Sequence, residues 1–215
     1  MCPNGNADLT RSLIINSAIQ IIGQDGLSAL TAGRLIEQAG ISKGGLYHHF
    51  RTMQEVEIEV LERLLQSLTM EVNGYPDPTS HEEFLVSLEK MLFDYLIENA
   101  ENSRALFAFM SEAAYNPKVK VLLRNLSDDL LLNWQRQLAI LSPAVSAASL
   151  NNTAQIISTV HIGLMTRFFI TEDQTSLKLY WRGCKGMLEG LLGIIHSYEK
   201  PVGKAVPDLM TGTVS

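Results

Sequence analysis

The chain has 215 residues, which corresponds to one large domain or two small ones. Its composition, with 46% hydrophobic and 19% charged residues, 15 glycines and 7 prolines, matches average globular proteins and excludes collagen-like, low-complexity and largely disordered chains. The formal net charge of −6 argues against a general nucleic-acid coat protein, because phosphate backbones bind Lys and Arg.

The first predicted helix begins at about Asp8 or Thr10, either of which is expected to cap its first turn. Gly23 and Gly26 are expected to mark its end, because glycine accepts the left-handed conformation that often follows a helix. The apolar face of this helix has the spacing i, i+4, i+7 and i+8 and consists of Ile14, Ala18, Ile21 and Ile22.

Two short helices and a long one are predicted next. The short helices span about 31–38 and 42–50 and are separated by a turn at Gly40, and the long helix spans about 52–73. Each has a hydroxyl side chain at its expected N-cap position, and these residues are Thr31, Ser42 and Thr52.

The remaining chain also follows helical periodicity, interrupted by segments that contain proline. Residues 74–80 form the first interruption, because Pro76 and Pro78 would cost hydrogen bonds inside a helix. Residues 200–215 have few apolar anchors and are expected to form a loosely ordered, flexible tail. The predicted helices of this part span about 81–100, 103–115, 117–141, 147–171 and 175–199.

Residues 31–50 read TAGRLIEQAGISKGGLYHHF, which predicts a helix, a turn that pivots on glycine, and a second short helix. This is the helix-turn-helix arrangement, whose second helix enters the major groove of DNA. Gly44 and Gly45 each cost about 1 kcal/mol relative to Ala, but small residues in a first turn leave backbone N–H groups open to a phosphate. Further hydrogen-bond donors on this surface are expected from Ser42, Lys43, Tyr47 and His48.

The charge of the chain is unevenly distributed. Residues 1–52 carry a formal charge of +1, whereas the remaining chain carries −7, so a surface that binds anions is expected at the N-terminus. The sequence predicts an all-α protein, with an N-terminal three-helix helix-turn-helix domain in residues 1–52 and a C-terminal helical bundle in residues 53–199.

With this motif the chain resembles the TetR family of bacterial transcriptional regulators. The resemblance rests on the first helix (RSLIINSAIQIIGQDGLSAL), the helix led by Thr31, the stretch AGISKGGLYHHF and the adjoining fourth helix, and it covers about residues 8–60. It implies an all-helical homodimer, whose small N-terminal domain binds a palindromic operator and whose larger C-terminal domain binds a small effector and dimerises.

The resemblance also implies which residues touch DNA. Lys43 and Tyr47 are expected to be the strongest contacts to the DNA backbone, whereas Leu46 and Phe50 are expected in the core. Arg34 faces out of its helix and is expected to contact the backbone as well. The predicted DNA-binding residues are Thr31, Arg34, Ser42, Lys43, Gly44, Gly45, Tyr47 and His48.

Two positions depart from the family pattern. Family members often carry more basic residues before the first helix and a Lys at the start of the fourth, whereas this chain has only Arg11 before its first apolar stretch and Thr52-Met53-Gln54 at the second position. Fewer phosphate contacts are expected to weaken the salt dependence of DNA binding.

Aromatic and methionine residues recur at helical spacing in the C-terminal region, which is typical of an ordinary core as well as of a ligand cavity. His161 lies in an apolar helix and needs a partner, which is either a neighbouring helix or a ligand. Arg167 is expected to pair with an anionic effector or with an acidic side chain across the dimer. The surroundings are largely apolar, so we expect a hydrophobic or aromatic effector. The candidate ligand-binding residues are Phe107, Met110, Trp134, His161, Met165 and Phe168.

Residues 150–199 are predicted to form the dimer interface. Glycine is costly inside helices, so several glycines in one helix indicate a close approach of backbones. These glycines are Gly163 in one predicted helix and Gly183, Gly186, Gly190 and Gly193 in the next. The fourth helix, which leads from the DNA-binding domain into the bundle, is expected to transmit the effector's preference for one conformer.

Other classes of protein find little support in the sequence. His48 and His49 point about 100° apart on a helix, which argues against a metal pair. Ser87 and Lys90 have the spacing of a penicillin-binding nucleophile without its companion motifs, and the motifs of other enzymes are absent. Neither Cys2 nor Cys184 belongs to a C-x-x-C pair. No secretory signal or run of about 18 apolar residues is present, so no membrane association and a cytoplasmic location are expected.

These observations predict a ligand-responsive transcriptional regulator that acts as a repressor, with no catalytic residues, cofactor or metal. The alternative is a helical ligand-binding or scaffold protein that does not bind DNA.

Overall fold

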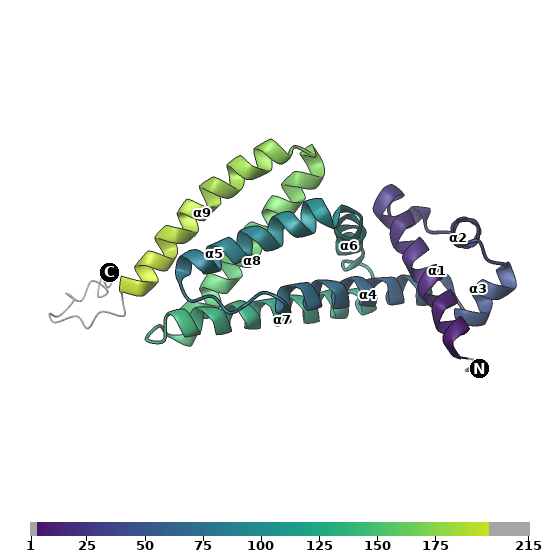
Figure 1. Ribbon diagram of the computed structural model, residues 1–215, viewed down its shortest axis with the longest axis horizontal. Coiled ribbons are helices and arrows are strands. Elements are labelled where there is room, and N and C mark those ends of the chain that lie inside the picture. The colour runs from purple at the N-terminus through teal and green to yellow at the C-terminus, as the bar shows by residue number, and fades with distance from the viewer. Residues whose placement is uncertain (1–3, 198–215) are drawn as a thin grey trace, which may run out of the picture.

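The computed structural model describes residues 4–197, and the regular structure of these residues is helical throughout (Figure 1). The predicted all-α fold class is therefore confirmed. The predicted tail, residues 200–215, and Cys2 lie outside the described residues.

The helices follow one another in the predicted order. The N-terminal elements are α1 (Asn4–Asp25), the 3-10 helix η1 (Leu27–Ala29), α2 (Ala32–Ala39), α3 (Lys43–His49) and α4 (Met53–Asn73). The C-terminal elements are α5 (His81–Phe93), the π-helix η2 (Asp94–Glu98), α6 (Ala100–Glu112), α7 (Pro117–Leu141), α8 (Ala147–Thr171) and α9 (Gln174–Ser197).

Hydroxyl side chains cap the three helices that follow α1, as the sequence predicts. The side-chain oxygens of Thr31, Ser42 and Thr52 accept hydrogen bonds from the backbone N–H groups three residues further on, at 3.3, 3.0 and 3.2 Å. Gly40, with φ 62°, ends α2 in the left-handed conformation and turns the chain towards α3.

The predicted start of the first helix is wrong. The helix begins at Asn4, upstream of both Asp8 and Thr10, so neither residue caps it. At the other end it continues through Gly23 to Asp25, and Gly26, with φ 83°, ends it. A helix tolerates an internal glycine, so this residue type alone does not fix a terminus.

The predicted helix over about 81–100 is interrupted. Residues 94–98 form a π-helix, and the N–H of Asn99 donates to the carbonyl oxygen of Asp94 at 3.0 Å. Within this segment Tyr95 and Leu96 are buried. The next helix begins at Ala100 rather than at Ser103, the predicted start.

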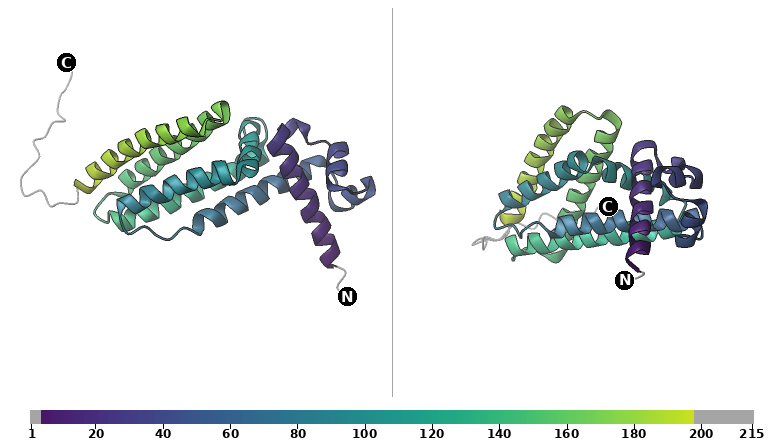
Figure 2. Two further views of the ribbon diagram at one scale, coloured as in Figure 1. Left: turned by 45° about the horizontal axis from the view of Figure 1, so that its top comes forward. Right: turned by 45° about the vertical axis from the view of Figure 1, so that its right-hand side comes forward.

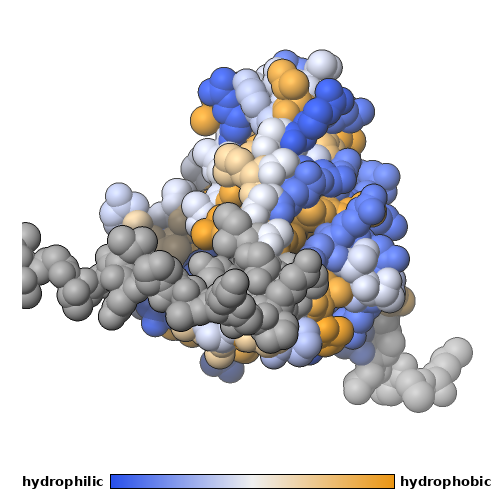
Figure 3. Space-filling model, turned by 90° about the vertical axis from the view of Figure 1, so that its left-hand side faces the viewer, coloured by the Kyte–Doolittle hydropathy of each residue, from blue (hydrophilic) through white to orange (hydrophobic). Residues whose placement is uncertain are grey.

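The molecule is elongated, with α1, α2 and α3 at one end and the far end of α9 at the other (Figures 1 and 2). The helix α4 leads from the first group into the bundle, where α7 and α8 as well as α8 and α9 lie against each other. Viewed from the end opposite α1–α3, apolar side chains reach the surface at several places between polar ones (Figure 3).

Two clusters of buried side chains hold the fold together. The first runs from α1 through α4 and on to α6, and thus crosses the predicted domain boundary at residue 52. The second joins α5, α7, α8 and α9. The division into residues 1–52 and 53–199 stays a prediction, and the two parts share one apolar core.

The helices α1 and α6 make the most extensive contact between any two elements. A Cβ atom added to Gly23 would lie 2.6 Å from the carbonyl oxygen of Glu101, so the two backbones meet at a position where only glycine fits. Next to this point, the side-chain amide of Gln24 donates to the Glu101 carboxylate at 3.0 Å. The helix α6 thereby fixes α1 to the bundle.

Candidate nucleic-acid interface and internal cavity

The helix α3 presents one face to the core and one to the surface. Leu46 and Phe50 are buried against Leu35 of α2 and the helix α4, which places both predicted core residues in the core. Tyr47, by contrast, is 43% exposed. Most of the predicted DNA-binding residues are exposed; these are Thr31, Arg34, Ser42, Lys43, Gly44, Tyr47 and His48, while Gly45 is half-buried.

The glycines of α3 serve no internal packing. A Cβ atom on Gly44 would lie 3.8 Å from the hydroxyl oxygen of Ser42, and one on Gly45 would lie 3.4 Å from it, so the fold itself accommodates side chains at both positions. The lack of side chains therefore keeps the first turn of α3 narrow on its outer surface. This shape suits a close approach of another backbone.

Ion pairs leave few free cations in this part of the chain. Arg34 forms an ion pair with Asp25, so a contact to DNA would compete with that interaction. Lys43 and Arg51 are exposed, and the described residues offer neither of them an ion pair. The sequence analysis did not predict a DNA contact for Arg51. Its position between α3 and the capped start of α4 could have indicated one.

Arg11 has a structural role that the sequence did not reveal. Its guanidinium pairs with the carboxylate of Glu59, donates to the carbonyl oxygen of His49 at 3.0 Å, and lies 4.4 Å from the centre of the Phe50 ring. It therefore joins α1, the end of α3 and α4. The paired residues are 48 positions apart, and no local pattern indicates such a contact.

An internal cavity of about 420 Å³ lies between helices α4 to α8. Its wall is mostly aliphatic and aromatic, and it includes five of the six predicted ligand-binding residues, namely Phe107, Met110, Trp134, His161 and Met165. The size is that of a typical site for a small molecule. Ligand binding by these residues stays a prediction.

The sixth predicted residue, Phe168, is not part of this wall. It is buried in the second apolar cluster and packs against Phe169, with 6.0 Å between the ring centres. Helical spacing from Met165 suggested a shared face, but the cavity ends before this turn of α8. Arg167, one residue earlier, lies 5.7 Å from the centre of the Tyr180 ring and outside the cavity wall.

His161 is held by the protein itself. Nδ1 lies 3.0 Å from the carbonyl oxygen of Ile157, and Nε2 lies 3.2 Å from that of Leu88. A neutral imidazole has one N–H and donates to only one of these oxygens. Burial lowers the pKa of this ring, because it disfavours the charged form, although the two carbonyl oxygens favour it. The predicted partner from a neighbouring helix is thus present, in Leu88 of α5, while contact of this histidine with a ligand stays a prediction.

Two basic side chains, Lys120 and Arg124, contribute to the cavity wall from α7. Both are exposed, and neither has an ion-pair partner within residues 4–197. The wall contains no carboxylate. Sequence analysis did not identify these residues, because their position at the cavity depends on how α6 and α7 pack.

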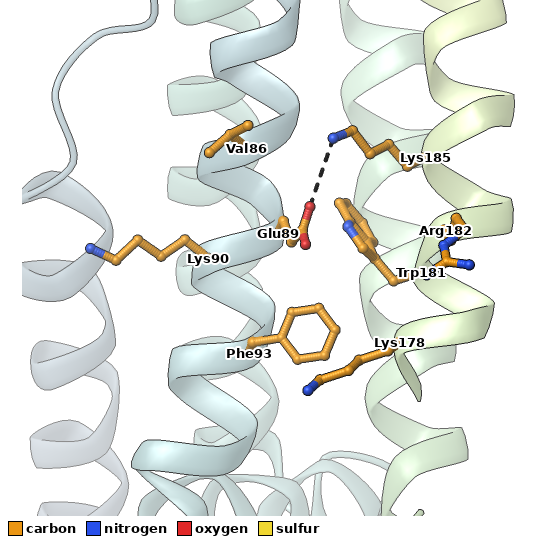
Figure 4. A pocket seen from close by; sticks show the side chains of 8 residues that line it. All are labelled: Val86, Glu89, Lys90, Phe93, Lys178, Trp181, Arg182 and Lys185. Atoms are coloured by element: carbon orange, nitrogen blue, oxygen red, sulfur yellow. Dashed lines mark ion pairs between the residues drawn. The ribbon is translucent and has the colours of Figure 1, made fainter. Parts of the chain in front are cut away.

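A second, more open hollow of about 710 Å³ lies between α5 and α9 (Figure 4). Lys178, Arg182 and Lys185 line it from α9, and Lys185 pairs with Glu89 of α5 at 3.8 Å. Trp181 also lines this hollow, and its buried indole N–H has no hydrogen-bond partner within the described chain.

Comparison with known proteins agrees with the motif of the N-terminal helices. Residues 14–60, from α1 into α4, match the family described as bacterial regulatory proteins, tetR family. The chain belongs to the TetR family. This TetR-family protein is a transcriptional regulator with a DNA-binding helix-turn-helix, like the curated relatives that it resembles.

Two relatives and one solved structure illustrate the extent of the similarity. The regulator UidR of Escherichia coli K12 is 24% identical over 197 residues, 86% of this chain and 94% of its own. The regulator BetI of Vibrio parahaemolyticus is 23% identical over 147 residues, 66% of this chain and 73% of its own. A putative transcriptional regulator from Saccharomonospora viridis in complex with choline shares the fold, with a TM-score of 0.71, 16% identity, and 85% and 96% of the two chains covered.

The last two helices of this TetR-family regulator leave apolar side chains at the surface. The exposed apolar residues are Ile156, Ile162 and Ile170 on α8 and Leu179, Tyr180 and Met187 on α9. No atom lies within 4 Å of a Cβ atom built on any of the glycines Gly163, Gly183, Gly186, Gly190 and Gly193. These glycines therefore mediate no close contact within the described chain, and the space next to them is open.

Within the described residues of this TetR-family protein, no group of three or more His, Cys, Asp and Glu side chains has a metal-binding arrangement. None of the helices described here has the length and apolar character needed to cross a bilayer.

Proposed function

We propose that this TetR-family regulator is a repressor that binds a palindromic operator as a homodimer and is released by a small, mainly apolar effector. The observation that carries the proposal is the outer surface of α3, where exposed donor side chains surround two glycines that the fold does not require. Such a surface supports entry of the helix into a major groove.

The contacts divide into two kinds. Lys43 and Tyr47 are proposed to bind phosphates and set the position of α3, while Ser42 and His48 donate to base edges. Gly44 and Gly45 allow the backbone to come close to the DNA. Thr31 contributes from the start of α2, and Arg34 does so when it leaves Asp25.

The exposed apolar faces of α8 and α9 support a homodimer. Isoleucine, leucine and methionine side chains on the surface of two adjacent helices, together with open glycine positions, would be covered by the same helices of a second copy. A two-fold dimer presents two copies of α3, which meet successive major grooves when they are about 34 Å apart.

The cavity supports control by a small molecule. The helix α6 contributes Leu106, Phe107 and Met110 to the cavity wall, and the same helix makes the extensive contact with α1. The helix α4 also joins the two regions, with Leu68 at the cavity. An effector that shifts α6 or α4 would therefore change the position of α3, provided that it binds one conformer more tightly.

The effector is proposed to differ from choline, which the Saccharomonospora viridis regulator binds in its structure. Choline is a cation, and a cation in this cavity would face Lys120 and Arg124 with no carboxylate in the wall to compensate.

The proposal is tested with a DNA fragment from upstream of the protein's own coding sequence. We expect a sequence-specific shift at low salt that is abolished in Lys43→Ala and Tyr47→Ala and retained in Lys118→Ala, an exposed lysine on α7. Circular dichroism serves to establish that all variants are folded. Failure of the wild-type protein to bind this DNA at low salt would contradict the proposal, as would unchanged binding by the first two variants.

Repression is tested separately by transcription from the same fragment in vitro. Addition of the wild-type protein is expected to lower transcript yield. An increase in yield would show that the protein is an activator.

A further inference from the structure

We propose that the internal cavity binds an amphipathic organic anion, with an apolar body inside the bundle and a carboxylate or equivalent group at Lys120 and Arg124. This inference rests on the proposed function, because it assigns a chemical class to the effector of that cavity. The pair of basic residues on α7 would select ligands with a negatively charged group. The apolar wall would select ligands with an apolar body.

The two basic residues form a site that is only positively charged. They are four positions apart on α7, so their side chains lie on the same face of the helix, where like charges repel each other. All other lining residues are neutral or, like His161, have a lowered pKa. An anion placed between the two cations is favoured by both and meets no carboxylate.

The pair is also available for a ligand. Arg136, further along α7, is by contrast paired: its guanidinium binds both carboxylate oxygens of Asp77 at 2.7 and 2.8 Å. Arg124 and Lys120 have no such partner among the described residues. Each of the two exposed cations adds a modest attraction for an anion, and two of them acting on one group favour an anion over a neutral ligand of equal shape.

The interior of the cavity favours an uncharged body. The nitrogen atoms of His161 face the carbonyl oxygens of Ile157 and Leu88, so the ring is already engaged by the backbone. The Trp134 ring packs against His161 with 5.6 Å between ring centres and adds a flat apolar surface. Inside the cavity a charged group would lose its hydration and meet only hydroxyl groups, such as that of Tyr95, which is buried without a hydrogen-bond partner among the described residues. At the exposed basic pair it keeps part of its hydration and gains two cationic partners.

The experiment compares ligands that differ only in charge. The planar series is anthracene carboxylate, anthracene methanol and anthracene methylammonium, and the chain series is decanoate, decanol and decylammonium. Affinities are measured by calorimetry on the full-length protein below the critical micelle concentrations. In at least one series we expect the carboxylate to bind about tenfold more tightly than the alcohol, and the ammonium compound to bind most weakly.

The chain offers a closely matched pair of variants. Lys120→Ala with Arg124→Ala is expected to remove the preference for the carboxylate. Lys178→Ala with Arg182→Ala removes the same two residue types at the same spacing on α9, where both side chains are exposed and line the other hollow, and is expected to leave the preference unchanged. Thermal unfolding establishes that both double variants fold.

Three results would overturn the inference: no preference for the carboxylate in either series, a preference that survives the α7 substitutions, or one that is lost with the α9 substitutions. The outcome is separable from that of the proposed function. Operator binding without a preference for anions contradicts the inference alone, whereas a preference for anions without operator binding contradicts the proposed regulator alone.

Discussion

Arg34 and Arg11 show how the partner of a surface arginine decides what it can bind. Both belong to the N-terminal helices, where a positive side chain would ordinarily serve a phosphate, yet both are engaged by carboxylates of the protein. Lys43 and Arg51 remain without such partners in the described chain. A dimer would thus offer four free cations to DNA, and a salt slope of about −4 is expected, which is shallow for an operator-binding protein.

Release of Arg34 is expected to strengthen DNA binding. Asp25→Asn removes the carboxylate that holds this guanidinium, so one more phosphate contact per subunit becomes available and the slope of log K against log salt steepens by about 0.9 for each. Fluorescence anisotropy with the operator fragment at several salt concentrations measures the slope. Glu37→Gln, on an exposed residue of α2, makes the same change of charge. Equal slopes for the two variants would mean that Arg34 does not contact DNA.

Buried His161 is expected to make the protein sensitive to acid. Because burial lowers the pKa of the folded-state ring below its usual 6.5, the unfolded chain binds the proton more readily. The stability that this residue contributes is complete above pH 6.5 and is lost as the pH falls from there towards the folded-state pKa, by at most about 1.4 kcal/mol per pH unit. Urea unfolding between pH 7.5 and 5.5 is expected to show a smaller loss in His161→Phe than in the wild type. Parallel losses would assign the acid sensitivity to other groups.

At the scale of elements, α6 borders the cavity and also contacts α1. One of its sides contributes to the cavity wall, and its first turn contacts α1 where the Gly23 backbone meets the carbonyl oxygen of Glu101. The sequence suggested only α4 as the connection between the two regions. The contact between α1 and α6 is a second connection between the DNA-binding helices and the bundle, and it requires that residue 23 has no side chain.

Gly23→Ala is therefore expected to destabilise the protein. The new methyl group would lie 2.6 Å from a backbone oxygen, which cannot rotate away, so α1 and α6 must separate at a cost of about 1–3 kcal/mol. Gly33→Ala is the control, because its methyl group meets no atom within 4 Å and alanine favours a helix by about 1 kcal/mol. Urea unfolding measures both. A Gly23→Ala protein as stable as wild type would show that the helices adjust without strain.

At the scale of the whole molecule, the exposed faces of α8 and α9 are the surfaces through which the proposed dimer would form. In the single chain α3 lies at the end of the molecule opposite the far end of α9 (Figure 1). The faces contain large apolar side chains that cost free energy in water.

A charge within this face is expected to prevent dimerisation. Met187→Asp places a carboxylate among apolar residues of α9, and sedimentation at micromolar concentration is expected to show a monomer with weakened operator binding. Met70→Asp is the matched control, since Met70 of α4 and Met187 are both 64% exposed. A monomeric wild type, or equal behaviour of the two variants, would contradict the proposed interface.

What the sequence could predict depended on the range of the interactions involved. The caps at Thr31, Ser42 and Thr52 were predictable because each acts on a backbone group three residues away. The π-helix at Asp94–Glu98 was not, because the apolar spacing of a single turn does not distinguish it from an α-helix.

The same distinction applies to the cavity. Aromatic and methionine residues on successive turns indicated five of its lining residues, but where the cavity ends, before Phe168, depends on how α8 packs on other helices. The basic pair on α7 reads as ordinary surface charge in the sequence. Only its position beside α6 brings it to the cavity.

The contact between Gly23 and Glu101 bears on the construction of chimaeric regulators. If residues 1–52 were joined to the bundle of another family member, α1 would meet a foreign α6, and any side chain or shift at that crossing would tilt the grafted part. A transplant that also carries the first turn of α6 keeps the crossing intact. The unit that can be exchanged between regulators therefore includes residues from two separate segments of the chain. A single junction at residue 52 does not separate this unit from the rest.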